Sequence, residues 1–166
     1  MQIGEGFAGD GANAAHINTV LGSKDGPVGV AWTTALATPR AGHTPFVVVV
    51  RPNVPVKPLT LFVNKATVDA ANDRHGTLTW GAAQAGVAAG VVAAVRKGIV
   101  RPEHADDLLL ISAVWVNPAA ADEDAVYENN LAATVAALAA GRDDLPSVRI
   151  VMDAGAPENP YFHARP

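Results

Sequence analysis

Apolar and polar residues alternate along the first part of the chain, a period of two that is typical of β-strands with one buried face. Residues 3–7 are expected to form a short edge strand, and a turn at 9–13 separates it from a second strand at 16–21. The second strand divides its side chains between two faces: Ile17, Thr19 and Leu21 on one, and His16, Asn18 and Val20 on the other.

Further along, apolar residues recur every three or four positions, which predicts three helices. Pro27 suits the first position of a helix that reaches about Thr38. A second helix is expected over 80–97, with Thr79 as its cap and Gly98 at its end. A third follows the acidic run 122–124 and ends at Gly141. The predicted buried stripes are Ala83, Val87, Val91 and Val95 in the second helix, and Tyr127, Leu131, Val135 and Leu138 in the third.

The uninterrupted apolar run 46–50 predicts a strand that is buried on both faces, and the largely apolar segment 108–116 predicts another buried strand. Between them, a proline-stiffened loop leads into a strand at 59–68, in which Leu61, Val63, Lys65 and Thr67 share one face. The order β-β-α-β-β-α-β-α indicates an α+β domain, a layered mixed sheet with helices, over residues 1–141. Residues 142–166, rich in Pro and Asp, are expected to form a tail that is loosely held or wrapped on a neighbouring molecule.

Composition narrows the possible partners. Only 17% of the 166 residues are charged while 49% are hydrophobic, so some apolar surface is expected to meet a partner, most simply another copy of the chain. The net charge is −4 and basic residues are not clustered, which argues against nucleic acid and anionic membranes. The absence of Cys excludes thiolate metal sites and Cys nucleophiles. With no export signal at the N-terminus and no apolar stretch long enough to span a membrane, a cytoplasmic protein is expected.

Three side chains are candidates for chemistry. His16 could donate a proton near neutral pH, or it could be a hydrogen-bonded strand residue, since a lone His has no fixed partner in the sequence. Lys65 could attack a carbonyl, reach solvent or bind an anion. Gln84, near the predicted start of the second helix, could bind a polar ligand beside free backbone N–H groups or simply be exposed. The remaining histidines, His43, His75, His104 and His163, lack metal-ligand spacing, and His75 is expected in a loop.

Several motifs in a fixed order resemble those of the formaldehyde-activating enzyme family. They are Ile3-Gly4-Glu5, Gly9-Asp10-Gly11, Ala15-His16-Ile17, Pro52-Asn53, Pro55, Lys57-Pro58, Thr60-Leu61, Asn64-Lys65, Thr67, Gly81, Ala83-Gln84 and Ala105-Asp106-Asp107-Leu108. The match is collinear over about the first 115 residues.

This resemblance implies a fold like the second domain of ribosomal protein S5, a homopentamer with sites between subunits, and no permanently bound cofactor or metal. It implies the condensation of formaldehyde with tetrahydromethanopterin, or another reduced pterin as co-substrate, to the methylene derivative and water. His16 would be the proton donor. The substrate-binding residues would be Asn18, Val47, Lys65, Thr67 and Gln84.

The chain also departs from the family pattern near the implied site. The family usually has Asp at the position of Asn18, and a different tripeptide at Asn117-Pro118-Ala119. An Asn offers one acceptor and a donor where a carboxylate accepts two hydrogen bonds. The alternative is therefore a non-catalytic or differently specific small-ligand-binding homologue with the same fold.

Overall fold

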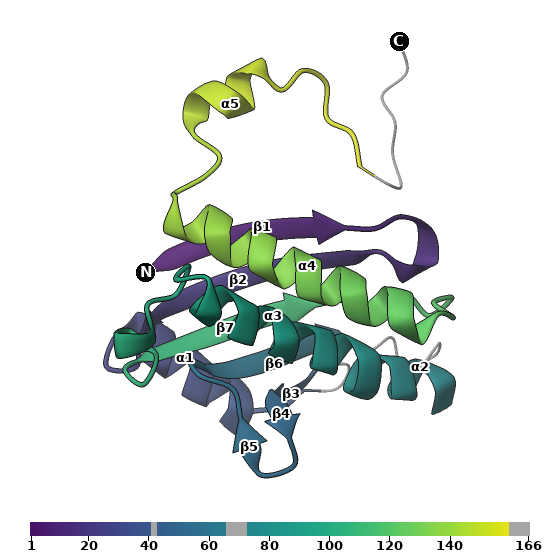
Figure 1. Ribbon diagram of the computed structural model, residues 1–166, viewed down its shortest axis with the longest axis horizontal. Coiled ribbons are helices and arrows are strands. Elements are labelled where there is room, and N and C mark those ends of the chain that lie inside the picture. Colours follow the sequence, from purple (N-terminus) through teal and green to yellow (C-terminus); the bar gives the residue numbers. More distant parts are fainter. Residues whose placement is uncertain (41–42, 66–72, 160–166) are drawn as a thin grey trace.

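Five strands form one mixed sheet in the order β1-β2-β7-β6-β3, as the computed structural model shows (Figure 1). The structure describes residues 1–40, 43–65 and 73–159. The strands are β1 Gln2–Ala8, β2 Ala15–Ser23, β3 His43–Val47, β6 Leu59–Lys65 and β7 Leu108–Val114. Strands β6 and β7 run parallel, and the other neighbours run antiparallel. The predicted α+β fold is confirmed, with a small additional hairpin of β4, Val49–Arg51, and β5, Val54–Pro55.

Helices lie on both faces of this sheet (Figure 1). They are α1 Pro27–Ala37, α2 Asp73–Thr77, the π-helical segment η2 Leu78–Ala83, α3 Gln84–Arg96, α4 Glu123–Arg142 and α5 Val148–Asp153, with short 3-10 turns at Gly11–Asn13 and Pro102–His104. Helices α3 and α4 pack on one face, where Ile17, Phe62 and Leu110 are fully buried. On the other face, α1 buries Leu61 and Leu109 beneath Val28 and Trp32.

The alternation of β2 is as expected: Ile17 and Thr19 are buried towards α3 and α4, while His16 and Asn18 are exposed on the face that carries α1. Helix α1 therefore covers only part of its face, and the uncovered part holds His16.

Two glycines fix the edge strand β1 against α4. A Cβ atom at Gly4 would overlap the carbonyl group of Ala137, and one at Gly6 would overlap that of Ala133. Only glycine lets the strand and the helix backbone come this close. The Gly in the motif Ile3-Gly4-Glu5 is thus required by packing, which fixes the position of Glu5 beside it.

The second helix begins earlier than predicted. Residues 73–96 are helical throughout, so Thr79 lies buried inside η2 instead of capping a helix. His75 is not in a loop: it is a buried residue of α2, with Nε2 2.9 Å from the carbonyl oxygen of Val116. Gly98, with φ 69°, ends the helix as expected. By length and composition, the helical segment Arg74–Arg96 could cross a membrane. However, 50% of its most apolar stretch is buried inside the protein, as in a core helix that covers a sheet.

Three other expectations need correction. Residues 46–50 are not one strand buried on both faces, because β3 is a sheet edge, the chain bends at Val48 into β4, and Val50 is 56% exposed. The third helix ends one residue after Gly141, which is buried against β1. Its buried stripe is Val126, Asn130, Ala133, Thr134, Ala137, Leu138 and Gly141, so of the predicted stripe only Leu138 is buried and Tyr127, Leu131 and Val135 are half-buried.

Candidate functional site

His16 has a carboxylate partner that reasoning from the sequence missed. Its Nε2 atom lies 2.9 Å from Oε1 of Glu5, and the two side chains are 53% and 59% exposed. The ring of Phe7 meets the imidazole edge-on, with centroids 6.2 Å apart. The imidazole is thus held by the Glu5 carboxylate and an aromatic contact while remaining open to a ligand.

The pairing of β1 with β2 explains this arrangement. Phe7 is directly opposite His16, and Glu5 is directly opposite Asn18. Opposite and diagonal positions on one face of an antiparallel pair lie within reach of long side chains. The signal was present in the sequence, because Glu5 and His16 both belong to the exposed sets of strands joined by a short turn.

Gln84 occupies a different environment. Its Oε1 atom accepts a hydrogen bond of 2.7 Å from the backbone N–H of Val49. The N–H groups around it are not free, because the helix continues unbroken from η2 and the N–H of Gln84 itself bonds to the carbonyls of Gly81 and Thr79. The expectation of a helix N-terminus here is therefore wrong. With Oε1 engaged, the side-chain NH₂ is the group that can donate to a ligand.

A groove of about 520 Å³ surrounds Gln84. Its lining includes Trp80, Arg51, Glu123 and Tyr127. Trp80 is 48% exposed and stacks on Phe46, which in turn stacks on Phe62, with centroids 4.7 and 4.8 Å apart. A fixed aromatic face beside an amide donor and a carboxylate suits a planar, polar ring. Sequence reasoning also missed Trp80, which it treated only as the first residue of a helix.

His16 and Gln84 do not meet within one chain. His16 is exposed on the face that carries α1, whereas α3 packs on the opposite face. The two residues are also separated along the sheet. His16 lies on β2, whereas Gln84 bonds to Val49, which follows β3. Strands β2 and β3 are three places apart in the sheet, a distance of roughly 14 Å at the usual strand spacing. Within one chain, His16 and Gln84 therefore do not line a common pocket.

The other predicted binding residues divide between described and undescribed parts of the chain. Asn18 is exposed on the His16 face, directly opposite Glu5. Val47 ends β3 and is half-buried beside the residues under α1. Lys65 ends β6 and pairs with His43 through the backbone, but its side chain lies outside the described residues, as does Thr67.

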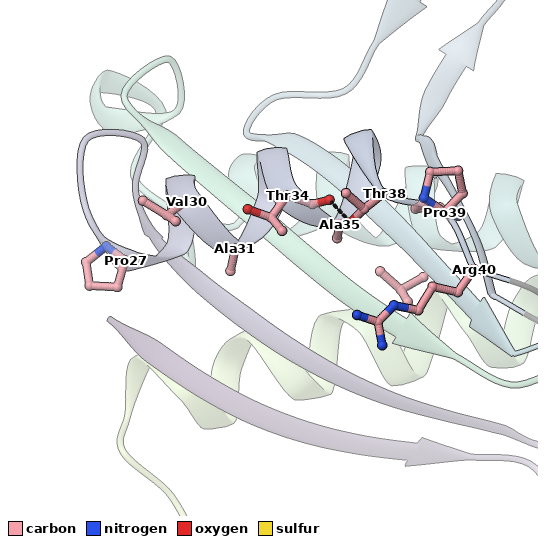
Figure 2. A pocket seen from close by; sticks show the side chains of 10 residues that line it. Pro27, Val30, Ala31, Thr34, Ala35, Thr38, Pro39 and Arg40 are labelled. Atoms are coloured by element: carbon pink, nitrogen blue, oxygen red, sulfur yellow. Dashed lines mark hydrogen bonds between the residues drawn. The ribbon is translucent and has the colours of Figure 1, made fainter.

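A second apolar groove lies on the α1 face, between that helix and the sheet. It is lined mainly by Pro27, Val30, Ala31, Ala35, Pro45 and Val63, with Arg40 as the charged side chain (Figure 2). Of the predicted catalytic and binding residues whose side chains the structure describes, none lines this groove. Within the described part of the chain, no three His, Asp or Glu side chains come close enough together to hold a metal ion.

The family model described as formaldehyde-activating enzyme (Fae) matches residues 3–162, almost the whole chain. The chain belongs to this family. The matched segment includes His16, Glu5 and Gln84, and extends through α5.

Two curated relatives illustrate the match. The chain is 42% identical over 146 residues to a 5,6,7,8-tetrahydromethanopterin hydro-lyase of Methanosarcina barkeri, covering 88% of this chain and 81% of that protein. It is 40% identical over 152 residues to the bifunctional enzyme Fae/Hps of Methanococcoides burtonii, covering 92% of this chain. The chain spans only 38% of that bifunctional protein's length.

Proposed function

We propose that the protein condenses formaldehyde with tetrahydromethanopterin, or a closely similar reduced pterin, to give the methylene derivative and water. It would then be a carbon-oxygen lyase of the formaldehyde-activating type, acting in the cytoplasm. Family membership and the name of the Methanosarcina barkeri relative support the reaction class. The observation that carries the proposal for this chain is the exposed His16–Glu5 pair, a positioned proton donor at 2.9 Å from its carboxylate.

The chemistry needs one proton donor. An amine nitrogen of the carrier adds to the carbonyl carbon of formaldehyde and gives a carbinolamine. Protonation of its hydroxyl by His16 lets the C–O bond break and water leave. A second carrier nitrogen then bonds to the same carbon and gives up its proton, which restores the imidazolium. Glu5 is a positioning residue: its carboxylate, 2.9 Å from Nε2 of His16, holds the ring in place.

Carrier recognition is the second requirement, because formaldehyde has almost no surface to bind and the free energy of binding has to come from the pterin. Gln84 and the exposed ring of Trp80 are suited to that task on one copy. Asn18, exposed on the same face as His16, would contact the carrier, and Val47, Lys65 and Thr67 are assigned the same role from the family pattern.

The separation of His16 from Gln84 favours a site shared by neighbouring subunits. A heterologous contact that repeats around an axis closes into a ring. We therefore assign the protein a homopentameric ring, the assembly implied by the family, in which one copy supplies His16 and the next supplies Gln84.

The experiment is a rate measurement against the uncatalysed background. Purified protein is mixed with formaldehyde and tetrahydromethanopterin, with tetrahydrofolate in a parallel series, and methylene product is followed with time. Acceleration with tetrahydromethanopterin is expected, and His16→Ala is expected to lower it by roughly 10²–10⁴-fold, the usual size of a lost general acid. No acceleration with either carrier, together with measurable carrier binding, would replace the proposal with the ligand-binding alternative that the replacement of Asp by Asn18 suggests.

A further inference from the structure

Residues 143–159, which follow α4, form an arm that stands away from the rest of the molecule (Figure 1). Every residue from Arg142 to Asn159 is exposed. The arm nevertheless contains a helix, α5, whose start is specified by Ser147: its Oγ accepts from the N–H of Ile150 at 3.4 Å. A helix of six residues is unstable alone in water, so α5 requires a surface to pack against.

Helix α5 has one apolar face. Val148, Val151 and Met152 lie at spacings of three and four, so they share a side of the helix, and they are 80%, 58% and 78% exposed. Ile150 points away from that face, and Arg149 and Asp153 lie to one side of it. An apolar stripe of this kind on an exposed helix marks a contact surface.

A groove that matches this stripe runs between α3 and α4. It has a volume of about 600 Å³, and its apolar lining includes Ala89, Val92 and Leu131. Arg96 and Lys97 line one end. The arm is acidic overall, since residues 143–159 contain four carboxylates and one Arg residue. The apolar lining of the groove therefore matches the apolar face of α5, and the basic end of the groove is complementary to the acidic arm.

The arm and the groove lie towards opposite edges of the sheet. The end of α4, from which the arm departs, packs on the start of the edge strand β1 through Gly141 and Gly4. The groove is lined by Val49 and Val50, which follow directly after the opposite edge strand, β3. When the β1 edge of one copy faces the β3 edge of another, the arm of the first points towards the groove of the second.

We propose that the arm is an assembly element: α5 of one copy packs its Val148, Val151 and Met152 face into the α3–α4 groove of a second copy of this chain. Its acidic residues face Arg96 and Lys97 of that copy. The contact joins different surfaces of the two partners, so it is compatible with a ring in which each copy contacts the next. Gln84, Val49, Val50 and Tyr127 line both this groove and the groove proposed for the carrier, so the arm lies beside the carrier site. The tests below follow the contact between copies and do not need the reaction.

The chain has no Cys, which permits a clean test by cross-linking. Two single-Cys variants, Met152→Cys and Ala89→Cys, are co-expressed with different tags and oxidised, so a disulfide between them can only be intermolecular. The matched control pairs Met152→Cys with Val30→Cys, an exposed position in the groove on α1. A covalent heterodimer is expected for the first pair and not for the control.

The opposite pattern, or no heterodimer in either pair, would overturn the proposal. So would packing on the arm's own chain, which the double variant Ala89→Cys/Met152→Cys detects as a cross-linked monomer.

A pair of charge substitutions tests the contact in solution without cross-linking. Val151→Asp places a charge on the apolar face of α5, and Ile150→Asp places the same charge on the other side of the same helix. Light scattering is expected to show a shift towards smaller species at micromolar concentration for Val151→Asp, with Ile150→Asp remaining like the parent. Equal behaviour of the two variants would contradict the proposed orientation.

Discussion

Replacement of Glu5 by Gln tests whether the carboxylate beside His16 assists the proton transfer. The substitution keeps the shape of the side chain and removes its charge. Both partners are more than half exposed, so the pair falls in the class of ion pairs that contribute about 0.2–1 kcal/mol. If that whole free energy acts on the step in which His16 donates its proton, the rate falls by about 1.4- to 5-fold.

This effect is far smaller than the loss expected when His16 itself is removed, and the difference makes a double-mutant cycle informative. Glu5→Gln is compared in the parent and in the His16→Ala background by measuring kcat for methylene formation. In the His16→Ala background the Glu5 substitution should change nothing, because its partner is gone. Glu103→Gln is the matched control, an exposed residue that precedes β7 at the opposite end of that strand from the His16 side.

Two results would refute the reasoning. An equal loss in both backgrounds would show that Glu5 acts independently of His16. A rate for Glu5→Gln that matches the rate for Glu103→Gln would show that the pair has no part in catalysis.

The remaining predictions concern packing, acid stability and the position next to His16. Gly4→Ala should lower the melting temperature markedly, since the new Cβ overlaps the Ala137 carbonyl and β1 has to move away from α4. Lys57, 2.8 Å from Asp106, holds the pKa of that carboxyl below its usual range, so the pair stabilises the fold above about pH 4 and the contribution is lost as the pH falls through the lowered value. Lys57→Met should therefore lower the melting temperature slightly at pH 7 and leave it unchanged near pH 2, and a difference that persists at pH 2 would contradict this. Asn18→Asp should raise kcat/KM by less than about tenfold, because Glu5 already places a carboxylate beside His16 and the new carboxylate, directly opposite Glu5, is repelled by it. A larger rise would contradict this role of Glu5.

Local patterns predicted most of the fold, because each element follows from rules that act over a few residues. The alternation in β2 placed His16 and Asn18 on one face, and the proline at 27, the glycine at 98 and the acidic run before α4 marked helix ends correctly. The errors arose where tertiary contacts, and not the local sequence, determine where a helix begins or ends. The segment before Gln84 continues as a helix against the core, and Gly141 meets β1 inside α4 instead of ending the helix.

The site was predictable in its residues but not in its arrangement. The family motifs named His16 and Gln84, yet periodicity within each segment does not say that the two lie on opposite faces of the sheet. The alternation of β1 and β2 carried part of the signal for Glu5, but it is their register that places Glu5 next to His16. Trp80 stands out through its stack on Phe46. Such pairings depend on strand order and on helix position, which are properties of the whole domain.

The most direct test of the account is subunit complementation. His16→Ala removes the proton donor, and Gln84→Glu removes the amide donor while keeping an acceptor for the N–H of Val49. Each variant alone should be nearly inactive in the condensation of formaldehyde with tetrahydromethanopterin. In a ring assembled at random from equal amounts of both, roughly a quarter of the sites pair an intact His16 with an intact Gln84 of the neighbouring copy.

The mixed assembly, formed by co-expression or by refolding together, is therefore predicted to recover roughly a quarter of the parent activity per site. An activity no greater than the mean of the two separate variants would contradict a site shared between copies, and with it the assignment of His16 and Gln84 to one reaction.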